Sequence, residues 1–199
     1  MSHPERSAER DAALMAMLPF VELDGWTIAA LRDAAGPNAD LLFPGGPRDM
    51  IEAYCDLGDR WMEEGAKAIV ATRVSDRVRA IIALRLEQNR EYKGAVRRAL
   101  GVLVVPGNQL LSARCTARTI DAIWHAAGDQ SADFSWYTKR AILTAVYGTT
   151  LLFWLQDSSE GDGRTLALLD RLLRGVGKIS QMRRRLGGLR ARLQPRTTG

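Results

Sequence analysis

The chain of 199 residues has few of the side chains that carry most enzyme and metal chemistry, with two histidines and two cysteines in all. Neither His3 nor His125 stands in an HExxH motif or a histidine–cysteine cluster, which argues against zinc hydrolases and carboxylate di-iron bundles. Cys55 and Cys115 match no metal-binding or redox spacing. We therefore expect no metal site, no cofactor, and two reduced, partly buried thiols.

Motifs for nucleotide and acyl-transfer chemistry are absent as well. No GxSxG nucleophile elbow occurs. The single Gly-Lys pair, Gly177-Lys178, is followed by Ile179, and Leu172 stands where the first glycine of a phosphate-binding loop would be. Because no constellation of catalytic groups remains, we expect that the protein is not an enzyme.

The chain also lacks an apolar run long enough to cross a bilayer. Its longest uncharged stretch, residues 141–156, falls short of the roughly 20 residues that a membrane span needs, so it predicts a buried helix. The N-terminal residues 1–14 carry three acids and no apolar core of a signal peptide. These features predict a cytoplasmic protein of a bacterium, or a chain that has already been trimmed.

The charge is distributed unevenly along the chain. Of the 28 Lys and Arg residues, nine lie in residues 171–199, which hold no acid; residues 1–170 carry 19 basic against 23 acidic residues. The excess of positive charge therefore belongs to the C-terminal tail, and the rest of the protein is mildly acidic.

Helical periodicity dominates the sequence, and the alternation typical of strands is nearly absent. We therefore predict an all-α fold. The expected helices cover residues 5–18, 26–35, 38–43, 47–69, 75–103 as one helix or two, 109–127 and 132–155, with a loop at 157–163.

Residues 26–54 have the spacing of a helix-turn-helix. Its expected recognition helix, residues 37–43, contains Asp40 and no cation. A carboxylate there would repel the phosphate backbone, so we expect no nucleic-acid binding. The alternative is a ligand-responsive transcription regulator of the tetracycline-repressor (TetR) type.

The tail has the pattern of a basic amphipathic helix, with apolar residues at steps of three and four and arginines between them. Such a helix can lie in a membrane interface, although a coiled-coil seam, a solvated end or a nucleic-acid arm would show the same pattern. The expected membrane contacts are Ile179, Met182, Arg183, Arg184, Arg185, Leu186, Leu189 and Leu193.

A longer and more varied pattern occupies residues 121–159. Its distinctive positions are Trp124, Gly128-Asp129, Ser131, Asp133-Phe134, Trp136-Tyr137-Thr138-Lys139-Arg140 and Asp157-Ser158, supported by Leu42-Phe43-Pro44-Gly45, Arg85-Leu86, Pro106 and Asn108. Over most of residues 23–173 the chain thus resembles the Coq9 family of ubiquinone-biosynthesis accessory proteins.

This resemblance implies a TetR-like fold that no longer binds DNA. It implies a degenerate helix-turn-helix region at 1–60, a lipid-binding helical domain at 61–174 and the tail at 175–199. It also implies a non-enzymatic homodimer, peripheral to the bacterial inner membrane, which binds isoprenoid quinone intermediates and phospholipid. The expected protein partner is the di-iron demethoxyubiquinone hydroxylase.

The resemblance assigns the partner-binding surface to Asp133, Trp136 and Tyr137, with Arg140 adjoining it. These residues share one helical face, and Trp, Tyr and Arg are typical of interface hot spots, although the two aromatic residues would equally suit a core. Apolar residues that any core would contain are the candidates for the lipid cavity: Ile81, Ile82, Leu100, Leu103, Leu143, Val146, Tyr147, Leu151 and Trp154.

Overall fold

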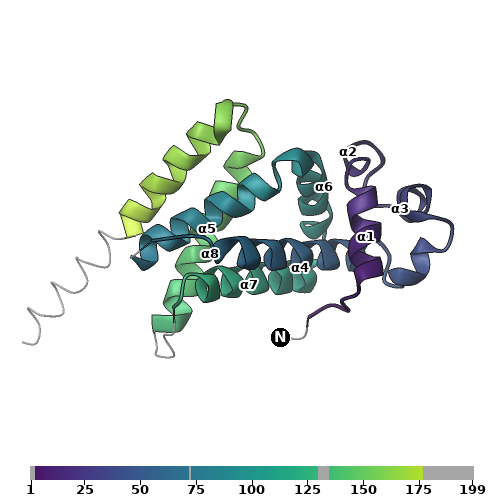
Figure 1. Cartoon of the computed structure of the whole chain (residues 1–199), viewed down its shortest axis with the longest axis horizontal. Coiled ribbons are helices and arrows are strands. Elements are labelled where there is room, and N and C mark those ends of the chain that lie inside the picture. Colours follow the sequence, from purple (N-terminus) through teal and green to yellow (C-terminus); the bar gives the residue numbers. More distant parts are fainter. Residues whose placement is uncertain (1–2, 72, 130–134, 177–199) are drawn as a thin grey trace, which may run out of the picture.

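The computed structural model describes residues 3–71, 73–129 and 135–176. For residues 135 and 136 it describes the backbone alone. Throughout these residues the fold is helical and contains no strand, which confirms the predicted all-α class (Figure 1). The elements are α1 (Ala8–Met17), α2 (Val21–Asp24), α3 (Ile28–Ala35), η1 (Ala39–Leu42), α4 (Pro47–Ala66), α5 (Val74–Gln88), η2 (Arg90–Tyr92), α6 (Lys93–Leu103), α7 (Gln109–Ala126), α8 (Ser135–Trp154) and η3 (Glu160–Asp162). Residues 163–176 form a further helix.

Local capping explains where the first helices begin. The side chains of Ser7 and Thr27 accept hydrogen bonds from Arg10 N and Ala30 N, at 3.1 Å each, and Pro47 occupies the first turn of α4. The short helix α2 is an element that the sequence pattern did not predict.

The segment expected to be a recognition helix is only one turn of 3₁₀ helix, η1. Its acid, Asp40, is paired with Arg32 of α3 at 2.7 Å. A single turn is too short to place a row of side chains in the major groove, which argues against DNA binding, whereas the pairing with Arg32 offsets the charge of Asp40 and weakens the electrostatic argument.

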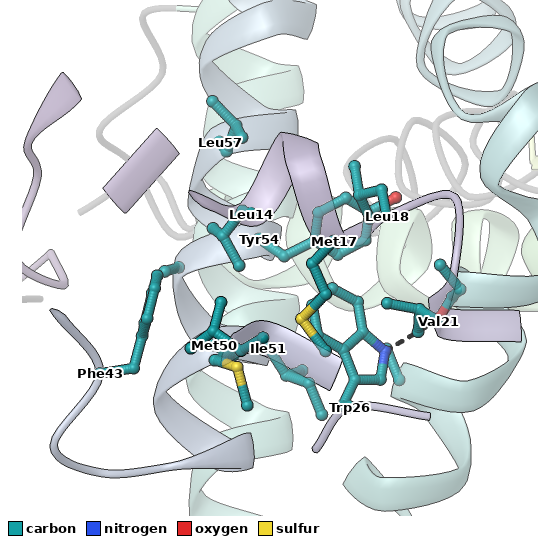
Figure 2. Close-up of a cluster of buried hydrophobic side chains, with 14 of the residues drawn as sticks. Leu14, Met17, Leu18, Val21, Trp26, Phe43, Met50, Ile51, Tyr54 and Leu57 are labelled. Atoms are coloured by element: carbon teal, nitrogen blue, oxygen red, sulfur yellow. Dashed lines mark hydrogen bonds between the residues drawn. The ribbon is translucent and has the colours of Figure 1, made fainter. Parts of the chain in front are cut away.

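A first hydrophobic cluster joins α1, α3 and the start of α4 to α6 (Figure 2). Leu14, Met17 and Met50 are completely buried in it, and Trp26 packs against Tyr54 with ring centroids 5.1 Å apart. The indole Nε1 of Trp26 donates to the Ala95 carbonyl at 3.1 Å. The N-terminal helices are therefore fixed to the rest of the fold by a shared core.

A second cluster contains the end of α4 with α5, α7, α8 and the helix at 163–176. Along α4 the change of cluster falls between Leu57 and Met62. The boundary expected at residue 60 thus lies inside a continuous helix, which packs lengthwise on α7 (Figure 1). Two cores share one long helix.

Asp157 joins α8 to the helix at 163–176. Its carboxylate accepts hydrogen bonds from Ser159 N and Oγ at 2.9 and 2.7 Å, and from Thr165 N and Oγ1 at 2.8 and 2.6 Å. These bonds hold its pKa well below the usual range, with the Thr165 hydroxyl as the largest cause. The carboxylate therefore caps this helix.

None of the helices in the described part of the chain has the length and apolar character required to cross a membrane.

Candidate functional site

A cavity of about 100 Å³ lies where the two hydrophobic clusters meet. Helices α4, α5, α6, α7 and α8 all contribute to its wall. Its lining is mostly apolar and includes Val96, Leu100 and Leu103 from α6 and Leu151 and Trp154 from α8. A largely apolar cavity with a few convergent polar groups is the usual form of a small-molecule site.

The polar part of the wall is centred on Arg85 of α5, which is only 8% exposed. Its Nη1 lies 2.9 Å from Asp59 Oδ1 of α4, and its Nε donates to Tyr147 Oη of α8 at 3.0 Å. Burial alone would lower the pKa of Arg85, but attraction to Asp59 and Tyr147 raises it. Arg85 is therefore a permanent buried cation.

Further polar side chains complete this network. Thr119 of α7 donates from Oγ1 to Asp59 at 2.9 Å. Tyr54 donates from Oη to Asn89 Oδ1 at 2.5 Å, and Asn89 Nδ2 donates to the Arg85 carbonyl at 2.8 Å. Burial raises the pKa of Asp59 and of both tyrosines, Tyr54 and Tyr147.

Gly58 makes room for this network on α4. A Cβ at this position would lie 3.2 Å from Arg85 Nη1, tighter than ordinary contact. Glycine inside a helix costs about 1 kcal/mol relative to alanine, and here it allows the guanidinium to approach the helix backbone. A glycine on the apolar face of a predicted helix was the sequence signal for this close approach.

The two cysteines are not joined by a disulfide; Cys55 is partly buried, as expected, Cys115 is fully buried, and both line the cavity. Arg118 Nη2 donates to Cys115 Sγ at 3.7 Å. A hydrogen bond between the two thiols raises the pKa of Cys55 and lowers that of Cys115. They come from α4 and α7, so their proximity is a tertiary feature.

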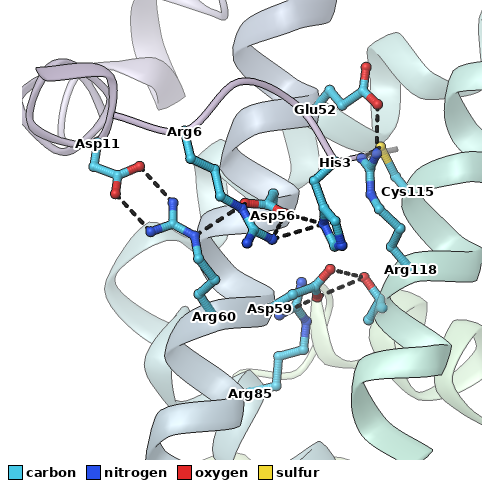
Figure 3. Close-up of polar contacts among 11 residues, drawn as sticks. His3, Arg6, Asp11, Glu52, Asp56, Asp59, Arg60, Arg85, Cys115 and Arg118 are labelled. Atoms are coloured by element: carbon cyan, nitrogen blue, oxygen red, sulfur yellow. Dashed lines mark hydrogen bonds and ion pairs between the residues drawn. The ribbon is translucent and has the colours of Figure 1, made fainter. Parts of the chain in front are cut away.

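Ionic groups cover the α4 side of the network, outside the cavity (Figure 3). Arg6 and Arg60 both bind the buried carboxylate of Asp56, at 2.6 and 3.1 Å, and Arg60 also pairs with Asp11 at 2.7 Å. Burial is the largest single influence on Asp56 and raises its pKa, but hydrogen bonds from Arg6, His3 and Arg60 and the charge of Arg6 together outweigh it, so that the pKa is lowered. These pairs fasten the N-terminal segment to α4.

The structure places five of the nine expected lipid-cavity residues around this one cavity: Leu100, Leu103, Tyr147, Leu151 and Trp154. The other four, Ile81, Ile82, Leu143 and Val146, are buried in the second hydrophobic cluster and do not line the cavity. The sequence pattern marked Arg85 only as a position of the family resemblance, and it did not identify Arg85 or its partner Asp59 as part of the site. Arg85 lies four positions after Ile81 and therefore on the same, apolar face of its helix. A cation on such a face was the sequence signal that could have identified Arg85 as a buried polar residue.

The expected partner-binding surface lies at the start of α8, beside the end of α7. Tyr137 is 71% exposed, and Arg140 Nε donates to Asp121 of α7 at 2.5 Å. Asp133 and the side chain of Trp136 lie outside the described residues, as do all the membrane contacts expected at residues 179–193. Of the expected surface, Tyr137 and Arg140 are therefore the residues whose side chains the structure describes.

No group of three or more His, Cys, Asp or Glu side chains in the described residues is arranged to hold a metal ion.

Comparison with known proteins gives a family match and a structural match. Residues 110–180 match the model of the COQ9 family. Ubiquinone biosynthesis protein COQ9-A, mitochondrial, of Xenopus laevis is 35% identical over 160 residues, which is 73% of this chain and 50% of that protein. Human COQ9 is 34% identical, also over 73% of this chain and 50% of that protein. The COQ9 protein of Schizosaccharomyces pombe is 32% identical over 144 residues, which is 71% of this chain and 57% of that protein. The chain spans about half the length of the curated relatives that it matches.

Among solved structures, a TetR transcriptional regulator from Nitrosomonas europaea superposes with a TM-score of 0.68. The match covers 84% of this chain and 97% of the regulator, at 21% sequence identity. This likeness confirms the predicted TetR-like fold.

Proposed function

We propose, because this chain belongs to the COQ9 family, that the protein acts in ubiquinone biosynthesis as a non-enzymatic, lipid-binding accessory protein. In this role it binds isoprenoid quinone intermediates at the membrane and presents them to the demethoxyubiquinone hydroxylase. The observation that carries the proposal is the similarity to COQ9 proteins over about three quarters of the chain.

The cavity between α6 and α8 supports the lipid-binding part of this proposal. Its apolar lining suits a hydrocarbon chain, but about 100 Å³ is well below the roughly 300–1,000 Å³ of ordinary ligand pockets. Binding an isoprenoid therefore requires the wall to move. Movement of α6 would break the hydrogen bonds that Lys93 and Arg97 donate to the carbonyls of Asp157 and Leu155, at 2.8 and 2.6 Å.

Mass spectrometry of an organic extract of the purified protein tests lipid binding. We expect isoprenoid quinone or phospholipid in the wild-type extract. Leu151 is partly exposed at the cavity wall, so Leu151→Trp should fill the entrance and reduce the lipid content. Leu152→Trp is the matched control, because Leu152 is 60% exposed and does not line the cavity. Wild-type extracts without lipid, or equal lipid in both variants, would contradict the proposal.

The start of α8 is proposed as the surface that binds the hydroxylase. Trp136→Lys should abolish capture of the hydroxylase in a pull-down and leave the circular dichroism spectrum unchanged. The same cation introduced at Ala141, an exposed position further along α8, is the control. Unchanged capture by the Trp136 variant would remove this surface from the proposal.

The basic tail is proposed as the membrane contact, which would place the protein at the surface of the bacterial inner membrane. Deleting residues 176–199 removes most of the basic residues of the tail. The deletion should reduce flotation with anionic liposomes and have little effect with neutral ones, because the cations are attracted to anionic lipid. A deleted chain that floats like the wild type would refute the role of the tail.

The TetR-like fold favours a second candidate, a ligand-responsive transcription regulator that acts as a homodimer. The shortness of η1, a single turn, argues against it. A salt-dependent shift of duplex DNA by the tail-deleted protein would support this second candidate and overturn the first. Analytical ultracentrifugation of the same protein tests whether it is a homodimer, as both candidate functions predict.

A further inference from the structure

Helices α4 and α7 pack side by side and run in the same direction. Glu52 of α4 pairs with Arg114 of α7 at 3.2 Å. Further along both helices, Thr119 of α7 donates to Asp59 of α4 at 2.9 Å. Because the partners advance together along the two helices, positions one turn before a contact on each helix also face each other.

The two cysteines occupy such a pair of positions. Cys55 precedes Asp59 by four residues, and Cys115 precedes Thr119 by four. Residues four apart lie on one face of a helix, so the register of the helices directs the two thiols toward each other. They are hydrogen-bonded to each other, and both line the cavity. Two free thiols that face each other in contact have the arrangement from which a disulfide forms.

Arg118 of α7 makes Cys115 the more nucleophilic of the two thiols. Its Nη2 donates to Cys115 Sγ at 3.7 Å, and its Nη1 binds Glu52 at 2.8 Å (Figure 3). The hydrogen bond from Cys55, the largest cause, and the charge of Arg118 lower the pKa of Cys115. Burial and the nearby carboxylates oppose this shift. The thiolate is the nucleophilic form of cysteine, so these contacts favour attack by Cys115.

The cavity limits the size of a reagent that can reach this pair. Cys115 is only 4% exposed and Cys55 is partly exposed. The cavity of about 100 Å³ that both thiols line has room for a molecule slightly larger than water. Hydrogen peroxide has this size.

We propose that Cys55 and Cys115 form an oxidation site, at which a small hydroperoxide converts the two facing thiols into a reversible disulfide that links α4 to α7. Cys115 is the attacking thiol and Cys55 is the resolving thiol. The site is independent of the proposed lipid-binding function, because it requires only the facing thiols and the oxidant.

The reaction balances with hydrogen peroxide as the only oxidant. The Cys115 thiolate attacks one peroxide oxygen, the O–O bond breaks, and Cys115 becomes a sulfenic acid while hydroxide leaves. This hydroxide takes the proton of the Cys55 thiol and becomes water. The Cys55 sulfur then attacks the sulfenic sulfur, the S–O bond breaks, and the second hydroxide takes up the proton that Cys115 had released. Two thiols and one peroxide thus give one disulfide and two waters.

Oxidation of the reduced, full-length protein with hydrogen peroxide tests the site. Intact-mass spectrometry should show a loss of about 2 Da, the mass of the two hydrogens removed. Titration of thiols in denaturant should find none, a non-reduced digest should contain the two cysteine peptides joined, and dithiothreitol should restore both thiols. Two thiols that stay free, or a disulfide that joins two chains, would overturn the proposal.

Two serine variants test the order of the steps. Cys55→Ser removes the resolving thiol, so oxidation should stop at a sulfenic acid on Cys115 that dimedone traps. Cys115→Ser should leave Cys55 largely unmodified under the same conditions, because burial and the missing arginine contact keep this thiol protonated. Equal dimedone labelling of the two variants would contradict the assignment of Cys115 as the attacking thiol.

Arg118→Met tests the contact that activates Cys115. Loss of the guanidinium should slow the consumption of thiols by about three- to tenfold at pH 7, since the thiolate fraction falls with each rise in pKa. Arg114→Met is the matched control, because Arg114 also comes from α7 and binds the same carboxylate of Glu52, at 3.2 Å. Circular dichroism should show both variants folded. Equal oxidation rates in the two folded variants would refute the role of Arg118.

Discussion

Replacing Arg85 by methionine would test the buried network at its centre. The change removes the ion pair with Asp59 at 2.9 Å and the hydrogen bond to Tyr147 at 3.0 Å, and it leaves Asp59, only 6% exposed, without its cation. Breaking one partner of a buried ion pair costs about 3–5 kcal/mol. That is a large share of the roughly 5–15 kcal/mol by which a domain is stable.

Urea unfolding followed by circular dichroism would measure this loss. With a slope of about 2 kcal/mol per molar urea, Arg85→Met should lower the midpoint by about 2 M. Arg85→Met combined with Asp59→Leu should recover most of the loss, because replacing both charges with apolar side chains leaves no unpaired charge. A single variant that loses less than about 1 kcal/mol, or a double variant no more stable than the single, would refute the reasoning.

The pH dependence gives the same prediction an independent check. Burial already raises the pKa of Asp59 above its usual value, and loss of Arg85 should raise it further. The native variant then binds more protons than the unfolded chain between the unfolded pKa, near 4, and the raised native value. Its stability should therefore increase as pH falls from 7 to 5, so the difference from wild type becomes smaller. A difference that stays constant would contradict a buried, ionised Asp59.

Two further changes test the contacts that connect the helices. Asp157→Ala removes the four hydrogen bonds that cap the helix at 163–176 and should cost about 2 kcal/mol at pH 7 by urea unfolding. Because the native pKa of Asp157 is depressed, the stabilisation by this carboxylate is present above about pH 4 and is lost as the pH falls below it. The stability of the variant should therefore fall less steeply below pH 4 than that of the wild type, and an equal fall in both proteins would argue against the cap. Trp26→Phe removes the bond to the Ala95 carbonyl and should cost about 1–2 kcal/mol in thermal melts; an unchanged melting temperature would contradict that contact.

Much of the fold could be predicted from local sequence. Helical periodicity and capping residues placed most helices within a few residues of their observed bounds, as with Thr27 before α3 and Pro47 at the start of α4. The short α2 was missed because four residues are too few to show a period. The expected recognition helix proved to be a single turn, because residues 36–47 contain three prolines that interrupt regular helix.

The candidate site was predicted less completely. Apolar residues were chosen from one face of each helix, and that rule cannot separate a cavity wall from a solid core. Leu151 lines the cavity while Val146, on the same helix, is packed in the second cluster. Which of them meets empty space depends on the distance to the facing helix, and helical periodicity contains no information about that distance.

The sequence by itself determined the helical class, the family resemblance and the charge of the tail, because these depend on neighbouring residues and on composition. Only the tertiary structure decided that Arg85, Thr119 and Tyr147, from three different helices, line one cavity, and that Asp59 of a fourth helix pairs with Arg85. The physical reason is burial. A cation on a helical face is ordinary in water, and it becomes a specific feature only when the packing of other helices removes that water and brings an anion to it.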